Sequence, residues 1–466
     1  MITRMSSSAI QDAALSGKIK IAVVGLGQVG LPVALYFARA GCSVIGVDID
    51  EKRVRAMKKG VCPINTPAVV EMFGKLYNSG KMTFMSDPAR AAQESQVQIF
   101  CLPTPLREDA KLPDLSAITT AATVVGRAMK KGGLVILESS VYPGVTNNVL
   151  KPALEKASKM KAGRDFGLAY CFERIDPGNP SHRVDNTPKV VGGVTPESAK
   201  AAAAIYGLIV KAQIYQVSSC ETAELVKLTE NIFRDINIAY VNDIAIFCSK
   251  LGVDVLEVIE AASTKWSFMP HIPSAGVGGT CIPVNPYYLM ECAKNLGVTL
   301  PTVKQARKTN EAMPRYMARL VKDALKENGV PFRKARICVM GTAYKADIDD
   351  RRGSPGEDVA FVLQGMGAGV VCYDPVAVSA TKGLTFEKSL NKAVRNADCL
   401  VITMDHTAFK TLDLKAIAKL AHKPLAVVDG KHVLIPKDVV KLGITYRGLG
   451  RSAGSDKNIW NLKLRG

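Results

Sequence analysis

The stretch IAVVGLGQVGLPVALYFARAG, residues 21–41, decides the fold of the first half of the chain. Four apolar residues come first, glycines follow at positions 25, 27 and 30, and an apolar run long enough for a helix completes the stretch. Glycines at this spacing permit a tight turn between a strand and a helix, and they let an anionic group approach the N-terminus of that helix. The stretch therefore predicts the start of a βαβ unit.

An acidic residue ends the next apolar run, SVIGV, at Asp48. It lies about 20 residues after the first glycine, where an acid accepts a hydrogen bond from a ribose 2′-hydroxyl and repels a 2′-phosphate. This context favours NAD over NADP and disfavours a tight turn without a nucleotide. The residues of the turn that we expect at the cofactor are Gly25, Gly27, Gln28, Val29 and Gly30.

The rest of the chain alternates short apolar runs with helical stretches, and this pattern returns after about residue 320. Such alternation predicts parallel sheets with helices on both faces. From about 196 to 262 the pattern becomes helical, and residues 221–252, with no proline and no internal glycine before the end, predict one long helix. We expect an α/β protein in which two Rossmann-like doubly wound domains are joined by a central helical region.

Composition narrows the function. A chain of 466 residues with 47% hydrophobic and 22% charged residues is ordinary for a globular protein of several domains. The sequence has no run of about 18 apolar residues, so we expect no membrane span. Residues 1–17 look like a polar extension of uncertain order. Most of the eleven cysteines lie in apolar runs, which suggests a reducing cytoplasm, and no spacing suggests a metal site. The net charge of +19 is spread along the chain, so an anionic small substrate explains it better than nucleic acid does.

Several polar residues are candidates for chemistry. SAGVGGTCIPVNPYYL, residues 274–289, places Cys281 in a glycine-rich loop that Pro283 stiffens. Lys227 and Asn231 share a helix face, although exposed pairs of this kind are common. Glu173 follows an apolar strand, where parallel sheets place ligand groups, although a salt-bridged loop is the alternative.

Nine segments in order resemble the UDP-glucose/GDP-mannose dehydrogenase family, whose members use NAD to oxidise the C6 alcohol of a nucleotide sugar to a carboxylate. The resemblance covers roughly residues 18–451, and the segments read GLGQVGLPVA, VDIDEKR, LPTPLRED, LESSVYPGVT, FERIDPG, ELVKLTENIFRDIN, GVGGTCIPVNPYYL, AYKADIDDRRGSP and YRGLGR. The resemblance implies an NAD-binding domain, a dimerisation region and a UDP-binding domain. With the extension at 1–17, we expect these at 18–200, 201–318 and 319–466.

The resemblance also implies roles for individual residues. Cys281 becomes the nucleophile that forms a thiohemiacetal and then a thioester, Lys227 and Asn231 stabilise oxyanions and move protons, and Glu173 acts through a bound water. The further cofactor contacts are Asp48, Arg53, Thr104, Ser140 and Arg352. The substrate contacts are Arg174, Ile175, Lys227, Asn231, Arg234, Lys265, Gly278, Tyr344, Lys345 and Lys431, with Lys265 reaching a neighbouring subunit. The segment ERIDPG resembles the branch acting on UDP-N-acetylhexosamines, so UDP-N-acetylglucosamine is favoured, ahead of the mannosamine and galactosamine epimers and UDP-glucose.

The chain departs from the family pattern in one place that concerns the mechanism. Asn285 stands where the family usually has an aspartate, and an amide can orient a neighbour but cannot hold a proton as a carboxylate does. A catalytically silent sugar-nucleotide-binding relative is therefore an alternative. A two-electron hydroxyacid dehydrogenase is another, which the Cys281 loop and the second α/β domain disfavour.

Overall fold

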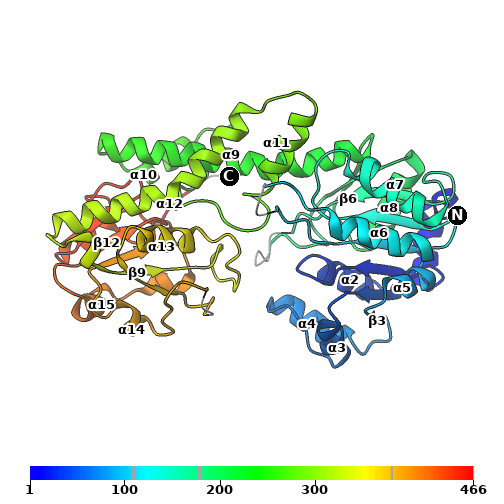
Figure 1. Cartoon of the computed structure of the whole chain (residues 1–466), viewed down its shortest axis with the longest axis horizontal. Coiled ribbons are helices and arrows are strands. Elements are labelled where there is room, and N and C mark those ends of the chain that lie inside the picture. The colour runs from blue at the N-terminus through cyan, green and yellow to red at the C-terminus, as the bar shows by residue number, and fades with distance from the viewer. Residues whose placement is uncertain (108–110, 176–180, 379–380, 465–466) are drawn as a thin grey trace. The chain divides into compact units, whose positions relative to one another are not determined.

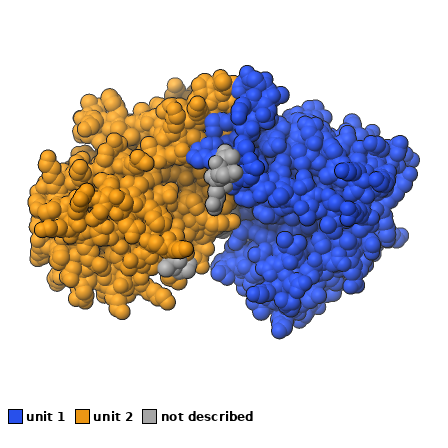
Figure 2. Space-filling model, viewed as in Figure 1, with its two compact units in different colours: residues 1–230, 287–298 blue, residues 231–286, 299–466 orange. Residues whose placement is uncertain are grey.

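The protein divides into two compact units, shown in two colours in Figure 2. The computed structural model describes residues 1–107, 111–175, 181–378 and 381–464. Unit 1 comprises residues 1–230 and 287–298, and unit 2 comprises residues 231–286 and 299–466. Each unit contains its own sheet with helices on both faces, so the predicted α/β class is confirmed. The three-part division of the chain stays a prediction.

The sheet of unit 1 has eight strands in the order β3-β2-β1-β4-β5-β6-β7-β8. Its first six strands follow the order of a dinucleotide-binding Rossmann domain, in which the chain reverses direction of winding between β1 and β4. All neighbouring strands are parallel except β6 and β7. The strands are β1 Ile21–Val24, β2 Val44–Val47, β3 Met82–Met85, β4 Val97–Phe100, β5 Leu134–Leu137, β6 Gly167–Cys171, β7 Lys189–Gly193 and β8 Ile214–Gln216.

Alternate residues of β1 enter two separate cores. Val23 packs into the core with Phe37, and Val24 packs into the core on the opposite face with Phe100. Helices α1, α2, α4 and α8 contribute to the first core, and α5, α6 and α7 to the second. The helices of this unit are α1 Ser7–Leu15, α2 Gly30–Arg39, α3 Glu51–Lys58, α4 Pro67–Leu76, α5 Pro88–Glu94, α6 Ser116–Ala128, α7 Lys151–Ser158 and α8 Pro196–Tyr206.

The first 17 residues differ from the sequence-based expectation. They form a short 3-10 helix, Ile2–Arg4, and helix α1. Ile10 and Ala14 lie four residues apart on one face of α1 and are buried, and Gln11 Nε2 donates to Ala204 O of α8 at 3.1 Å. The expected uncertain order was wrong, because two apolar residues at helical spacing suffice to dock the short helix.

The predicted long helix is confirmed as α9, Cys220–Leu251, which runs from unit 1 into unit 2 (Figure 1). Strand β8 interrupts the helical pattern expected before it. In unit 2, α9 is locked to α12, Pro301–Glu327, by Arg307 and Asn310, whose side chains donate to Asp235 Oδ1 at 2.6 and 2.8 Å. The other helices of the middle of the chain are α10 Val255–Ala262 and α11 Asn285–Asn295.

The second sheet has five parallel strands in the order β10-β9-β11-β12-β13. Helices α12 and α13 contribute to the core on one face, and α14, α15 and α16 to the core on the other. Among the described residues, no helix is long and apolar enough to cross a membrane. The elements are β9 Arg336–Met340, α13 Pro355–Gly365, β10 Gly369–Tyr373, α14 Leu390–Val394, β11 Cys399–Ile402, α15 Leu414–Leu420, β12 Ala426–Asp429, α16 Pro436–Lys441 and β13 Thr445–Gly448.

Candidate active site

The glycine turn after β1 contains glycines of two kinds. Gly25 has φ +95°, and a Cβ there would lie 2.4 Å from Cys101 O. A Cβ on Gly30 would lie 1.8 Å from Gly25 O, so the packing of the protein itself excludes a side chain at both positions. A Cβ on Gly27 would meet no atom within 4 Å. Internal packing does not explain Gly27, whereas the close approach of a pyrophosphate does.

The surroundings of this turn fit a dinucleotide. Helix α2 begins at Gly30 without a side-chain cap and without an acidic residue in its first turn, so no side chain of that turn competes with an anion for the helix N-terminus. Asp48 follows β2, where its Oδ2 accepts from Leu26 N at 3.0 Å and from Arg53 Nη1 at 2.9 Å. Thr104 and Ser140, which follow β4 and β5, are joined by a hydrogen bond of 2.8 Å from Thr104 Oγ1 to Ser140 O. The structure thus gathers these predicted cofactor contacts along one edge of the sheet.

Glu173 lies just beyond β6 and is almost completely buried. Its Oε1 accepts from the backbone N–H groups of Arg174 and Ile175, both at 2.8 Å, and its Oε2 accepts from Lys189 Nζ at 2.7 Å. Burial opposes the ionisation of Glu173, but the charge of Lys189 and these hydrogen bonds outweigh it, so the pKa of Glu173 lies below its ordinary value. Lys227 Nζ donates to the backbone oxygen of the same glutamate at 2.7 Å.

Arg174 is held by an ion pair. Its guanidinium pairs with Glu230 of α9, with Nε 3.2 Å from Glu230 Oε2, and it also donates to Pro188 O at 2.8 Å. Arg174 therefore takes part in a salt bridge, which is the alternative to a ligand-binding role for this loop. Residues 176–180 of the motif ERIDPGNP lie outside the described residues.

The loop around Cys281 is closely packed against the first loop of the second sheet. A Cβ on Gly278 would lie 2.6 Å from Gly353 O, and a Cβ on Gly279, which has φ +89°, would lie 2.9 Å from the ring of Tyr344. Gly279 N donates to Arg352 O at 3.1 Å. The backbone oxygen of Cys281 accepts from the N–H of Asn285 at 2.9 Å, while its side chain is exposed. The glycines thus hold an exposed thiol at a fixed place in the loop.

Asn285 is 1% exposed, and its Oδ1 accepts from Asn231 Nδ2 of α9 at 2.5 Å. Asn231 in turn lies one helical turn after Lys227. On the other side of the loop, Arg352 forms a fork with both carboxylate oxygens of Asp350, and this hydrogen-bonded pairing raises the pKa of Arg352. In unit 2 the structure therefore brings Cys281, Asn285 and Asn231 into one connected group.

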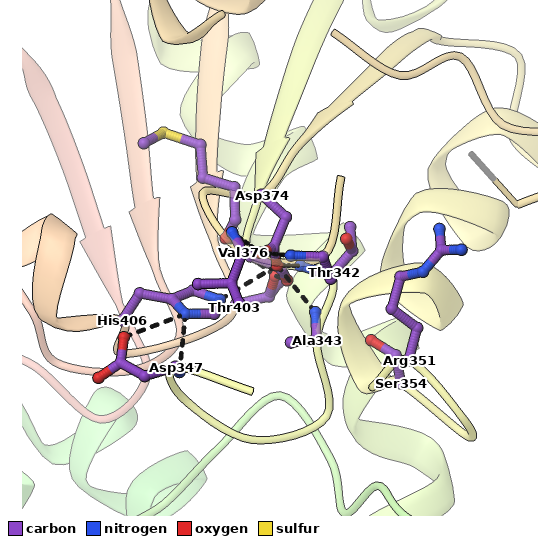
Figure 3. A network of polar contacts seen from close by, with 12 residues as sticks. Thr342, Ala343, Asp347, Arg351, Ser354, Asp374, Val376, Thr403 and His406 are labelled. Carbon is purple, nitrogen blue, oxygen red and sulfur yellow. Dashed lines mark hydrogen bonds and ion pairs between the residues drawn. The ribbon is translucent and has the colours of Figure 1, made fainter. Parts of the chain in front are cut away.

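The second Rossmann-like domain is built differently at its own strand-to-helix turn (Figure 3). Asp374 follows β10 as Asp48 follows β2, and both are buried, at 1% and 7% exposed. Its Oδ2 accepts from the N–H groups of Thr342 and Ala343 at 2.6 and 2.9 Å. Its Oδ1 accepts from Val376 N at 2.9 Å, so backbone donors reach both oxygens, as Leu26 N and Asp50 N do at Asp48.

His406 completes the enclosure of Asp374. Its Nδ1 accepts from Asp347 N at 3.0 Å, so the ring proton lies on Nε2, which donates to Asp374 Oδ2 at 3.1 Å. Burial opposes the charge on Asp374, but the bond from His406 and the backbone donors outweigh it and lower its pKa. Helix α13, unlike α2, is capped by Ser354 and carries Glu357 in its first turn. These features do not provide the ribose and pyrophosphate contacts of unit 1.

The remaining predicted substrate residues differ in their surroundings. Lys431 Nζ pairs with Asp405 at 3.1 Å, and Lys345 is partly buried in the loop after β9. Arg234 on α9 and Lys265 after α10 are exposed. Sequence reasoning missed Glu138, Lys189 and Glu224, which are buried and ionisable. For Glu138, its position directly after the apolar run LVIL was an available sign.

Fold and site together define a dinucleotide-binding oxidoreductase with two Rossmann-like domains. Comparison with known proteins gives the family. The NAD binding, central and UDP binding domains of the UDP-glucose/GDP-mannose dehydrogenase family match residues 19–210, 221–312 and 338–436. The chain belongs to that family, and NAD is its cofactor, as predicted.

Individual relatives agree with this placement. The chain is 36% identical to a UDP-N-acetyl-D-mannosamine dehydrogenase of Pyrococcus horikoshii, with 93% of this chain and 99% of the relative covered. It is 34% identical to a UDP-N-acetyl-D-glucosamine 6-dehydrogenase of Pseudomonas aeruginosa, with 89% and 97% covered. The solved structure of a P. horikoshii UDP-D-ManNAc dehydrogenase matches with a TM-score of 0.86 over 93% of this chain and 100% of that one, at 34% identity.

Proposed function

We propose that the protein oxidises the C6 hydroxyl of a UDP-N-acetylhexosamine to a carboxylate in two NAD-dependent steps. The observation that carries this proposal is Cys281, which alone among the eleven cysteines is exposed and lies in a glycine loop. Burial raises the pKa of a buried thiol, as at Cys42, where the pKa reaches about 11. An exposed thiol is open to attack a substrate carbon, whereas such buried thiols are not.

The residues divide the chemistry between them. NAD, when bound at the glycine turn, supplies the hydride acceptor for both oxidations. Lys227 takes the proton of the C6 hydroxyl as the aldehyde forms, and Cys281 then adds to that carbonyl carbon to give a thiohemiacetal. Loss of a second hydride leaves a thioester on Cys281. Water adds to it, the thiolate departs, and the carboxylate is released with one water consumed per sugar.

The proposed substrate class rests on the relatives and on the match to the UDP binding domain at residues 338–436. The match to the family's UDP binding domain supports a UDP carrier, and the relatives named above act on N-acetylmannosamine and N-acetylglucosamine derivatives. We favour UDP-N-acetylglucosamine, with its mannosamine and galactosamine epimers next and UDP-glucose as the alternative.

The test is the yield of NADH per mole of each UDP-sugar. A yield near two supports the four-electron reaction, and a yield near one contradicts it. Cys281→Ser should abolish sustained turnover while NAD and UDP-sugar still bind. Cys62→Ser is the matched control, because the Cys62 thiol is partly buried and its pKa is raised by burial, so its loss should leave turnover unchanged.

The pairing of Asn231 with Asn285 favours a second candidate, a silent protein that binds the sugar nucleotide without converting it. Two neutral amides joined to each other offer no carboxylate for proton handling. Tight binding of UDP-sugar with no NADH formed from any hexose would support this candidate and overturn the first.

We further propose that the protein is a homodimer. Phe233, Tyr240 and Phe247 recur every seven residues on α9 in unit 2 and are 45%, 57% and 63% exposed. Trp266, which follows α10, is 94% exposed. Large aromatic side chains are rarely left in water in such a row, and a second copy of the same helix can cover them.

The free state of all eleven cysteines supports a reducing compartment. We propose the cytoplasm, where NAD and sugar nucleotides are both available to an enzyme of this family. Formation of disulfides in protein purified without reductant from cells would contradict this location.

A further inference from the structure

Lys189, the first residue of β7, has a side chain only 2% exposed. Its Nζ donates to Glu138 Oε1 at 2.6 Å, to Glu173 Oε2 at 2.7 Å and to Phe172 O at 3.2 Å. An ammonium group has three donors, and each has an acceptor here. Lys189 thus forms a buried ionic bridge between Glu138 and Glu173, and all three of its donors are used.

The second carboxylate of the bridge is held as firmly as the first. Glu138 Oε2 accepts from Tyr206 Oη at 3.0 Å and from the Cys101 thiol at 3.4 Å. Glu138 and Glu173 are both almost completely buried, and one ammonium lies between them. Without Lys189, two like charges would face each other away from water, which is a costly arrangement.

The bridge reaches the proposed proton acceptor through one residue. The Glu173 carboxylate is fixed by Lys189 and by the backbone N–H groups of Arg174 and Ile175, while the Glu173 carbonyl accepts from Lys227 Nζ. A displaced Glu173 would move that carbonyl, whose oxygen orients the Lys227 amino group.

We propose that Lys189 is a positioning residue of the reaction, which keeps Glu173 ionised and so holds its backbone oxygen in place for Lys227. This inference rests on the proposed function, because it assigns Lys227 the role of proton acceptor. Glu173 then acts as a fixed anion whose oxygens are already engaged, and proton transfer falls to Lys227.

The inference predicts a change in pH dependence. The ionisable groups facing Glu173 are Glu138 after β5, Cys101 after β4, Cys171 of β6, Lys189 of β7 and Lys227 of α9, with the Tyr206 hydroxyl of α8 behind Glu138. Of these, Lys189 is the cation that contacts the carboxylate directly. With Lys189 absent, burial and the charge of Glu138 would raise the pKa of Glu173.

The experiment compares Lys189→Met, Lys189→Arg and the double variant Lys189→Met/Glu138→Gln with the wild type. In Lys189→Met we expect kcat at pH 7 to fall at least tenfold with the KM for NAD unchanged. The ascending limb of the kcat–pH profile should move to higher pH by at least one unit, because ionised Glu173 appears only there. Lys189→Arg should recover part of kcat. The double variant has the same net charge as the wild-type bridge, so it provides a folded form if Lys189→Met does not fold.

Arg451→Met is the control, since Arg451 is equally buried and its Nε pairs with Asp254 Oδ2 at 2.8 Å in unit 2. It should lose thermal stability without moving the pH limb. A folded Lys189→Met, or a folded double variant, with the wild-type kcat and pH profile overturns the inference.

A second readout does not depend on turnover. In Lys189→Met the pKa values of Glu138 and Glu173 should be raised. The folded state of this variant is then favoured by the protonated carboxylates, and that stabilisation is lost as the pH rises through the raised pKa values. Its deficit in Tm against the wild type should therefore grow from pH 5 to pH 8, and the double variant should show a smaller growth. An inactive wild type would refute the proposed function, while a pH-independent Tm deficit would refute the bridge itself.

Discussion

Asn285 connects the loop of the thiol to the helix of the lysine. It is buried, accepts from Asn231, and through that residue lies one helical turn from Lys227 along α9. An amide at this position provides orientation without charge. A carboxylate in its place would favour the protonated form of a neighbouring lysine, because an opposite charge nearby stabilises the ammonium.

The variant Asn285→Asp tests this difference. With an anion at position 285, Lys227 should lose its proton only at higher pH, so the ascending limb of the kcat–pH profile should move to higher pH. The measurement is that profile for the wild type and the variant with a UDP-N-acetylhexosamine. An unchanged profile would show that position 285 and Lys227 are not coupled, and activity that appears only in the variant would identify the natural protein as silent.

At the residue scale, local patterns predicted the site better than distant ones. Asp48 and the glycine turn were predictable because their spacing along the chain determines their neighbours. Lys189 was not, because a lysine before the apolar run VVGG looks like a solvated strand end. Its partners Glu138 and Glu173 are 51 and 16 residues away in sequence, and only the order of strands brings them together.

The strand–turn–helix element of unit 1 allows a matched pair of substitutions. Gly30→Ala places a methyl group against Gly25 O and should lower Tm by several degrees, whereas Gly27→Ala meets nothing in the protein and should leave Tm unchanged. If Gly27 makes room for the pyrophosphate, its alanine variant should bind NAD at least tenfold more weakly. Calorimetric titration with NAD and thermal unfolding separate the two effects. Wild-type NAD affinity in Gly27→Ala would show that the turn holds the cofactor in another way.

Glu224 joins two elements of unit 1. Its carboxylate accepts from Gly144 N at 2.6 Å and from Thr146 N and Oγ1 at 2.8 and 2.6 Å, and so ties the loop after β5 to α9. Burial raises the pKa of Glu224 to about 7, against the opposing effect of these hydrogen bonds.

Because this folded-state pKa is above the unfolded value, the stabilisation linked to Glu224 is complete below the unfolded pKa and is lost as the pH rises through about 7. The loss amounts to about 3 kcal/mol. Glu224→Gln should be less stable than the wild type at pH 5, and the difference should narrow toward pH 8. Unfolding in urea at several pH values measures it, and a constant difference would contradict the raised pKa.

Elements with strong periodicity were predictable, and those fixed by docking were not. Helix α9 was predicted because its apolar residues recur every three or four positions without a breaker. Helix α1 was not, because its anchors are the buried Ile10 and Ala14 and the hydrogen bond from Gln11 to Ala204 O, and these depend on the surface that α8 presents. The edge strand β8 has only three residues, and its pairing with β7 decides its structure rather than its own sequence.

At the scale of the whole molecule, the exposed aromatic row on α9 predicts the oligomeric state. The wild type should have twice the chain mass of 49.9 kDa by light scattering, and Phe247→Lys should shift it toward the monomer. Leu296→Lys is the control, because Leu296 is 75% exposed but lies outside that row. A wild-type monomer, or a dimer equally weakened by both substitutions, would refute the proposed interface.

The enclosure of Asp374 by His406 and backbone donors has a consequence for inhibition. An enzyme that needs a dinucleotide and a sugar nucleotide in the same turnover can be inhibited if either ligand binds in the site of the other, since both carry a ribose and a diphosphate. Both acids accept backbone hydrogen bonds, but the side-chain partner of Asp374 is the fully buried His406, whereas that of Asp48 is the partly exposed Arg53. The second domain therefore offers an adenosine ribose no partner of the kind that Asp48 provides. Accumulating NADH should therefore compete with NAD and leave the apparent affinity for the sugar nucleotide unaltered, so that the two ligands are regulated independently.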